Sequence, residues 1–146
     1  MYQYTKKAIE EFMNKAECVC GVVSYEVMGE IEKLYQCHCT LCQIQTGSSS
    51  QTGLFVEAEN FTWSSGKDYI TNFKKESGYS YSFCSKCGST VPNMFRTGDK
   101  YWVPAGALVG LSNARIDNHI FVADKAAWDE IGGEGVQHEG FYPVYV

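Results

Sequence analysis

The chain has 146 residues, of which 45% are hydrophobic, and twelve basic against seventeen acidic residues give it a formal net charge of −5. This length suits one domain with its own core. The acidic balance argues against a nonspecific nucleic-acid or anionic-membrane surface, because both depend on clustered positive charge. No apolar run approaches the roughly 20 residues of a membrane span, and the first residues lack a signal-type hydrophobic segment, so we expect a cytoplasmic protein.

The first seventeen residues differ in pattern from the rest of the chain. Apolar residues recur there at helical spacing among charged ones: Ala8, Ile9, Phe12, Met13 and Ala16. This periodicity predicts a short amphipathic helix over residues 1–17, added to a single domain over residues 18–146. The apolar stripe could pack on its own domain, on a second copy in a homodimer, or on a partner protein.

From residue 20 onward the sequence changes to short runs rich in aromatic and β-branched residues, separated by turns that contain glycine. Such runs predict strands. They cover residues 22–27, 34–37, 54–56, 61–63, 69–73, 79–83, 90–95, 101–104 and 119–122. We therefore expect a mainly β fold built on antiparallel sheet.

One further helix is predicted near the C-terminal end of the sequence. Residues 126–131 have helical composition, and Asp124 is placed to cap them. A glycine-rich stretch, residues 132–135, follows and would end the helix. The apolar residues 141–146 are expected to pack back on the domain.

The seven cysteines fall into three tight groups, and this spacing is typical of metal ligands. The groups are Cys18 and Cys20, then Cys37, Cys39 and Cys42, then Cys84 and Cys87. Disulfides within the Cys-x-Cys pairs would close very small, strained rings, and an odd count leaves one thiol over. Scattered buried thiols are the other alternative, but they are rarely grouped so densely.

A structural zinc ion usually takes four protein ligands, whereas a catalytic one takes three and keeps a position open. The two outer groups together supply four thiols, with Gly88 able to adopt the positive φ that such metal-binding turns often need. The middle group supplies three. A three-thiolate zinc could bind an incoming thiol and lower its pKa beside a carbonyl or hemithioacetal carbon. That arrangement favours making or breaking a carbon–sulfur bond.

An ordered set of motifs resembles the glutathione-dependent formaldehyde-activating enzymes and their relatives, which are zinc-bearing β-tent domains. The set consists of CVCGVVSY from residue 18, CHCTLC from residue 37 with Gly47, FTWSSG from residue 61, FCSKCGS from residue 83, AGAL from residue 105, and HIFV from residue 119 through to Trp128. The resemblance implies a structural zinc on Cys18, Cys20, Cys84 and Cys87, and a second zinc at the active centre on Cys37, Cys39 and Cys42.

The resemblance also implies an activity and a substrate class. It points to a zinc-dependent carbon–sulfur lyase that adds a small thiol such as glutathione to formaldehyde, or runs the reverse reaction on S-hydroxymethylglutathione. Family members commonly carry basic residues just after the third cysteine of the open site, where this chain has Gln43 and Gln45. Less positive charge there gives the carboxylates of glutathione less compensation, so a different small thiol adduct stays open.

Other residues near the open site receive more modest roles. In an extended Cys-x-Cys segment the side chain of His38 points away from its neighbours, which favours a structural role over a ligand or base. His119 is expected as a surface or packing histidine at a strand start, and His138 receives no role. The polar residues 47–53 could line a substrate pocket or could only shape the metal-binding turn.

Two other function classes stay open at this level. A non-catalytic zinc module would use its sheet or N-terminal helix to bind a protein partner, and it should show exposed apolar surface and a blocked fourth zinc position. A thiol-based redox or metal sensor should lose its metal and form disulfides on mild oxidation.

Overall fold

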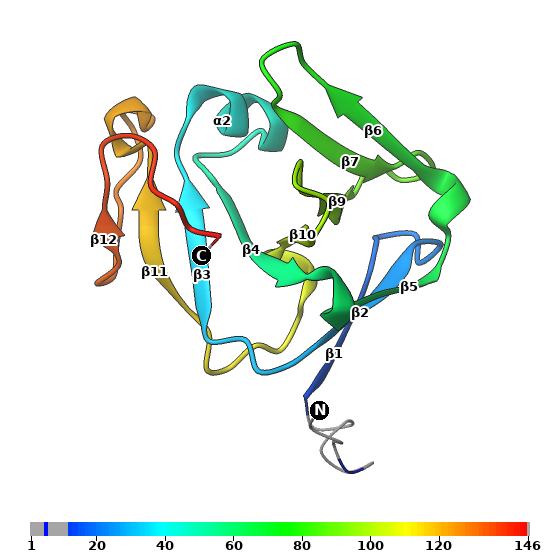
Figure 1. Cartoon of the computed structure of the whole chain (residues 1–146). Coiled ribbons are helices and arrows are strands. Elements are labelled where there is room, and N and C mark those ends of the chain that lie inside the picture. Colours follow the sequence, from blue (N-terminus) through cyan, green and yellow to red (C-terminus); the bar gives the residue numbers. More distant parts are fainter. Residues whose placement is uncertain (1–4, 6–11, 146) are drawn as a thin grey trace. The chain divides into compact units, whose positions relative to one another are not determined.

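The computed structural model describes Thr5 and residues 12–145 (Figure 1). The architecture is mainly β, as the sequence predicts, and it forms two compact units that are interleaved along the chain. The first unit comprises residues up to Glu30, Val56–Val103 and Ala107–Val109, and the second comprises Ile31–Phe55, Pro104–Gly106 and Gly110–Val146.

The first unit contains two antiparallel three-stranded sheets and a hairpin. One sheet has the order β1 (Met13–Glu17), β2 (Ser24–Met28), β5 (Phe61–Ser65), and the other has the order β6 (Ile70–Lys74), β7 (Ser80–Cys84), β8 (Thr90–Val91). The hairpin pairs β9 (Asn93–Met94) with β10 (Lys100–Pro104). Two 3-10 helices, η1 (Ala58–Asn60) and η2 (Lys67–Tyr69), precede β5 and β6. Pro92 separates β8 from β9, because proline has no N–H to donate to a sheet.

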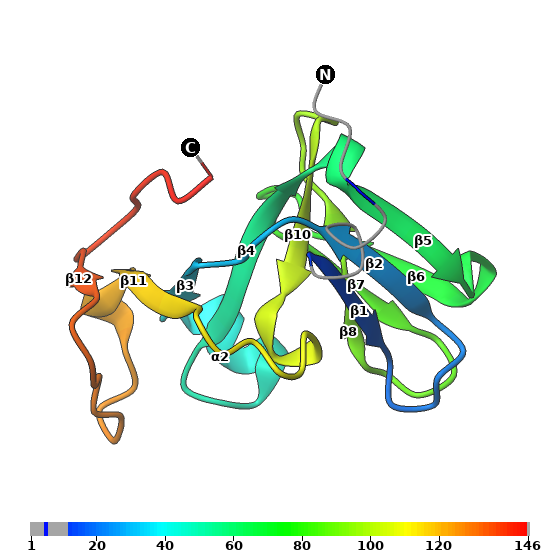
Figure 2. The ribbon, with the colours of Figure 1, turned by 90° about the horizontal axis from the view of Figure 1, so that it is seen from below.

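In the second unit four strands follow one another in the order β12, β11, β3, β4 (Figure 2). They are β3 (Lys33–Cys37), β4 (Gln51–Glu57), β11 (Arg115–Ile120) and β12 (Val136–Gln137). The pairing of β3 with β4 is antiparallel, but β11 runs parallel to both β3 and β12. The expected antiparallel arrangement is therefore incomplete. The helix α2 (Thr40–Thr46) and the 3-10 helices η3 (Ala105–Ala107) and η4 (Val122–Asp124) complete the described elements.

The hydrophobic core of the first unit contains two of the cysteines. Cys18 and Cys84 pack with Val23 and Val91, and all four side chains are buried. Trp63 and other partly buried side chains pack against this cluster. Each outer cysteine group thus contributes one buried side chain to the core, while Cys20 is exposed and Cys87 is partly buried.

Both helices expected from the sequence need correction. Residues 1–4 and 6–11 of the N-terminal one, predicted over residues 1–17, lie outside the described residues, while Met13–Glu17 form strand β1, paired with β2. Residues 126–131 form no helix; instead the short η4 begins at Val122, so Asp124 ends a 3-10 turn and does not cap a helix. Among the described residues no helix has the length and apolarity to cross a membrane.

Strand β5 ends at a turn that only glycine fits. Gly66 has φ +79° and leads into η2, and a Cβ there would lie 2.1 Å from the backbone oxygen of Val22. Gly98 has a similar φ of +77°, but a Cβ there would have no atom within 4 Å. Comparing alanine substitutions at Gly66 and Gly98 therefore separates the energetic cost of a positive φ from the cost of a steric collision.

We expect Gly66→Ala to destabilise the protein by more than about 4 kcal/mol, because the collision adds to the cost of a positive φ. Gly98→Ala should cost only about 1–2 kcal/mol, from the left-handed conformation alone. Urea unfolding of both variants measures the difference. Equal losses of stability would show that the contact with Val22 is relieved without cost.

Candidate metal centres

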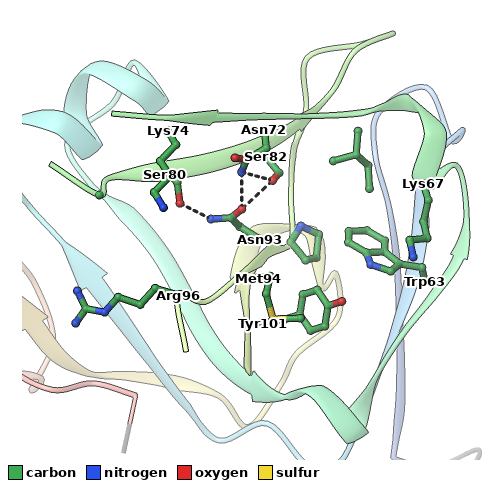
Figure 3. A pocket seen from close by; sticks show the side chains of 13 residues that line it. Trp63, Lys67, Asn72, Lys74, Ser80, Ser82, Asn93, Met94, Arg96 and Tyr101 are labelled. Atoms are coloured by element: carbon green, nitrogen blue, oxygen red, sulfur yellow. Dashed lines mark hydrogen bonds between the residues drawn. The ribbon is translucent and has the colours of Figure 1, made fainter. Parts of the chain in front are cut away.

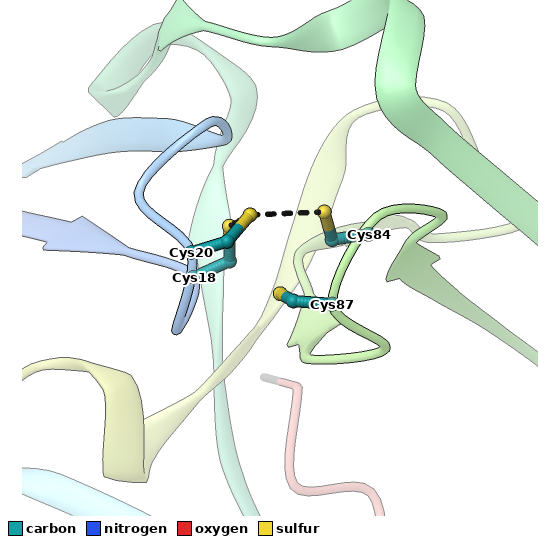
Figure 4. Close-up of side chains that lie close together, drawn as sticks. All are labelled: Cys18, Cys20, Cys84 and Cys87. Atoms are coloured by element: carbon teal, nitrogen blue, oxygen red, sulfur yellow. Dashed lines mark hydrogen bonds between the residues drawn. The ribbon is translucent and has the colours of Figure 1, made fainter.

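Four thiols from two distant loops meet in the first unit. Cys18 and Cys20 lie between β1 and β2, and Cys84 and Cys87 lie at the end of β7 and just after it (Figure 4). All four sulfurs lie within 4.8 Å of one another, with 3.5 Å between Cys18 and Cys20 and 3.8 Å between Cys20 and Cys84. A tetrahedral zinc with bonds of about 2.3 Å would set its sulfurs about 3.8 Å apart. The separations suit a four-thiolate metal site.

Local backbone turns aim these sulfurs at one point. In the first turn Gly21 has φ +78° and its N–H donates to the carbonyl of Cys18, and the N–H of Val23 donates to the Cys18 sulfur at 3.3 Å. In the second turn Gly88 has φ +77° and its N–H donates to the carbonyl of Cys84. Backbone N–H groups directed at sulfur stabilise thiolate, which is the form that binds metal.

Ser89 joins the two loops through its hydroxyl group. Its oxygen accepts a hydrogen bond from the backbone N–H of Val19 at 3.0 Å and lies 3.2 Å from the sulfur of Cys87. Hydrogen bonding from Ser89 lowers the pKa of Cys87 to about 5. This serine therefore holds the loops together and favours the thiolate, and nothing in the cysteine spacing indicates it.

Three thiols meet in the second unit. Cys37 ends β3, Cys39 is the N-cap of α2, and Cys42 lies in the first turn of that helix, where its N–H donates to the Cys39 sulfur at 3.3 Å. Their sulfurs lie within 4.8 Å of one another, and in the described part of the chain no fourth Cys, His, Asp or Glu joins them. Cys37 and Cys42 are buried, whereas Cys39 is only partly buried. Access to this group is thus through Cys39.

The three sulfurs share negative charge unequally. Hydrogen bonds from Cys37 and then Cys42 lower the pKa of Cys39, while the bond to Cys39 raises the pKa of Cys37 and the bonds to Cys37 and Cys39 raise that of Cys42. The group by itself therefore favours one thiolate, with two thiols donating to it. A divalent cation would relieve the repulsion that keeps the other two protonated.

His38 points away from the thiols, as predicted, into a buried histidine pair. Its Nε2 lies 3.0 Å from Nδ1 of His119, and its Nδ1 lies 3.8 Å from a carboxylate oxygen of Asp129. Burial lowers the pKa of both histidines, so the rings are neutral at pH 7 and one donates to the other. His119 is a packing residue, as expected, but it lies near the end of β11 and not at a strand start.

Gln43 and Gln45, which stand where family members commonly have basic residues, form hydrogen bonds that hold the loop. The Nε2 of Gln43 donates to the carbonyls of His38 at 2.8 Å and Asp124 at 2.9 Å, holding the cysteine segment to η4. Gln45 accepts a hydrogen bond from Gln51, whose own carbonyl oxygen lies 3.5 Å from the Cys42 sulfur. These amides fix the position of the thiols, and they give a structural reason for uncharged residues there.

The segment after α2 mainly connects elements. Gly47, with φ +66°, caps the helix by donating to the carbonyl of Gln43, and residues from Gln51 onward already belong to β4. Of the two roles considered for residues 47–53, these contacts favour shaping the turn around the thiols. His138 bonds Asn118 at 2.8 Å and stacks on Tyr142, consistent with the absence of an assigned role.

Residues 13–124 match the sequence profile of the glutathione-dependent formaldehyde-activating enzymes. The chain belongs to this family. A crystal structure of a protein from Rhodobacter sphaeroides has a similar fold, with a TM-score of 0.56 and 20% identity over 67% of this chain and 90% of that chain. No curated protein sequence matches the chain. The family assignment confirms the resemblance seen in the motifs, while the division of metal roles among the cysteines stays a prediction.

We expect His119→Leu to destabilise the protein by about 1–3 kcal/mol, because His38 would keep a buried ring nitrogen without its partner. His138→Gln is the matched control, since that side chain is only partly buried and glutamine keeps a hydrogen-bond donor; its cost should stay below about 0.5 kcal/mol. Urea unfolding of the metal-loaded protein measures both. An unchanged free energy of unfolding in His119→Leu would show that the hydrogen bond between His38 and His119 does not stabilise the protein.

Proposed function

We propose that this protein is a zinc-dependent carbon–sulfur lyase that acts on a thiol–aldehyde adduct such as S-hydroxymethylglutathione. The observation that carries the proposal is the partly accessible three-thiol group of Cys37, Cys39 and Cys42, separate from a closed group of four. Soft thiolate donors in sets of four and three suit one structural and one catalytic zinc. Family membership supports the same reaction class.

A zinc ion held by the three thiols would supply an open position at which the sulfur of a substrate thiol is stabilised as thiolate. In the breakdown direction the carbon–sulfur bond of the adduct breaks, the hydroxyl group loses its proton, and the aldehyde leaves. The sulfur keeps the bonding electron pair and is released as thiolate or, after taking up a proton, as thiol. The addition reaction reverses each change.

The contacts around the thiols indicate how the chain would support this chemistry. Cys37 and Cys42 are buried, which keeps water from two sides of the group, and Cys39 provides the accessible edge. Gln43 fixes the backbone of His38 between the two ligands Cys37 and Cys39. The Nε2 of His38 is hydrogen-bonded to His119 and is therefore not free to act as a base. The proton of the adduct would pass to solvent or to a group of the substrate.

A non-catalytic zinc module that binds a protein partner is the second candidate function. Val19, between Cys18 and Cys20, is 91% exposed, and Ile44 on α2 is 73% exposed. Apolar side chains presented beside metal-binding loops could contact a partner. Such a module would retain both metals and lack activity on every thiol adduct.

Metal analysis of two matched variants tests the division of roles. Wild type should hold two zinc ions per chain, one for each thiol group. Cys42→Ser should lose one ion and keep its fold. Cys84→Ser should lose the fold, because a four-thiolate zinc contributes on the order of 10–16 kcal/mol of apparent binding free energy, comparable with the whole stability of a domain. A Cys42→Ser protein that keeps both ions would contradict the proposal.

Exchange between formaldehyde and a small thiol, followed by NMR, tests the activity. The fully metallated protein should accelerate exchange for at least one thiol in a panel that includes glutathione. Cys42→Ser should lower the rate at least about 100-fold, since even residues behind metal ligands commonly cost 10- to 100-fold. Val19→Ser should leave it unchanged. A fully metallated wild type that is inactive with every thiol would favour the binding module.

A further inference from the structure

The first unit contains a pocket that none of the seven cysteines lines. Its volume is about 480 Å³, and its walls come from β6, β7, the β9–β10 hairpin and Trp63 of β5 (Figure 3). Small-molecule sites typically measure about 300–1,000 Å³ and combine apolar walls with a few placed polar groups. This pocket fits that description and is separate from the chemistry proposed above.

The charge of the pocket is opposite to that of the protein. Lys67, Lys74 and Arg96 line it, and no aspartate or glutamate is among its lining residues in the described part of the chain. The whole chain has seventeen acidic and twelve basic residues, so this grouping differs from the average surface. Within the described residues none of the three cations forms an ion pair with a carboxylate. They are available to an anionic ligand.

A chain of hydrogen bonds on the pocket wall ends in a hydroxyl donor. The side-chain oxygen Oδ1 of Asn93 accepts hydrogen bonds from Nδ2 of Asn72 and from the hydroxyl of Ser82, each at 2.8 Å, which fixes the orientation of the Asn93 amide. The Nδ2 of Asn93 then donates to the oxygen of Ser80 at 2.9 Å. Since the oxygen of Ser80 is the acceptor in that bond, the hydroxyl hydrogen of Ser80 is directed elsewhere. The Ser80 hydroxyl can therefore donate a hydrogen bond to a ligand.

The cations occupy two ends of the pocket. Lys74 lies directly opposite Ser80 in the β6–β7 pairing, and Figure 3 shows Arg96 toward the same end. Lys67 lies at the other end, beside Trp63. Lys67 precedes β6 and Lys74 ends it, and a five-residue strand spans about 13 Å. Two anionic groups of one elongated molecule could therefore be bound at once.

Aromatic side chains separate these charged ends. Trp63 and Tyr101 meet edge to face, with ring centroids 6.0 Å apart at an interplanar angle of 87°. Both residues line the pocket. Rings in this arrangement offer apolar contact to the middle of a ligand, whereas an inorganic anion would leave them unused.

We propose that this pocket binds a small organic dicarboxylate with an apolar middle. One carboxylate contacts Lys74, Arg96 and the hydroxyl of Ser80, and the other contacts Lys67. The fork of an arginine and the hydroxyl donor match the paired oxygens of a carboxylate. This site is additional to the proposed lyase function and does not require a metal at the three-thiol group.

Calorimetric titration with adipate, suberate, hexanoate and inorganic phosphate tests the proposal. Adipate or suberate should bind saturably and more tightly than hexanoate or phosphate. Lys74→Gln and Arg96→Gln should each weaken dicarboxylate binding roughly tenfold, the scale of one charge-assisted hydrogen bond. Lys67→Gln should weaken dicarboxylate binding similarly and leave hexanoate unaffected.

Lys75→Gln is the matched control, because it removes the same charge one residue further along from an exposed position that does not line the pocket. Its affinity should equal that of wild type. Cys42→Ser should also bind normally, which distinguishes this site from the lyase centre. The proposal is overturned by the absence of saturable binding, by equal losses in Lys75→Gln and Lys74→Gln, or by phosphate binding as tightly as the dicarboxylates.

Discussion

The first unit depends on the meeting of two loops that lie 64 residues apart, brought together at Cys20 and Cys84. Each loop is a tight turn closed by a backbone hydrogen bond, from Gly21 to Cys18 and from Gly88 to Cys84, and two of the four sulfurs are buried in the core. Four thiolates at these separations repel one another unless a cation lies between them. A metal ion would change the same four groups from a source of repulsion into a cross-link between β1–β2 and β7–β8.

Much of this arrangement could be predicted from the sequence because its signals are local. Paired cysteines with short gaps, followed by Gly21 and Gly88, specify turns that bring sulfurs together whatever the rest of the fold does. Most strand runs were placed to within a few residues for the same reason, since alternation and β-branched composition act over neighbouring positions. The run 119–122 overlaps β11 by only two residues, and β1 and β12 were not predicted as strands. The grouping of thiols into four and three followed from counting ligands, and the structure brings together both groups.

The errors arose where distant contacts override local pattern. The positions of Met13 and Ala16 are compatible both with an apolar helical stripe and with the strand that they form. The pairing of β1 with β2 decides in favour of the strand. The parallel pairing of β11 with β3 joins segments about 80 residues apart, so no nearby turn predicts it. The same pairing brings His119 to His38. Gln43 was noted only for the charge it lacks, because its carbonyl partners cannot be identified before the loop is folded.

The position of Cys39 at the start of α2 links metal content to secondary structure. A helix of seven residues is far below the length that is stable alone in water, so α2 depends on its cap and its neighbours. Its cap is a sulfur that is also a candidate metal ligand, and the next candidate, Cys42, donates its backbone N–H to that sulfur. Under the proposed assignment, loading the second metal would therefore also stabilise this helix, in addition to the hydrogen bonds of Gln43. In the apoprotein the segment after β3 would then open more often, which would expose its backbone to proteases.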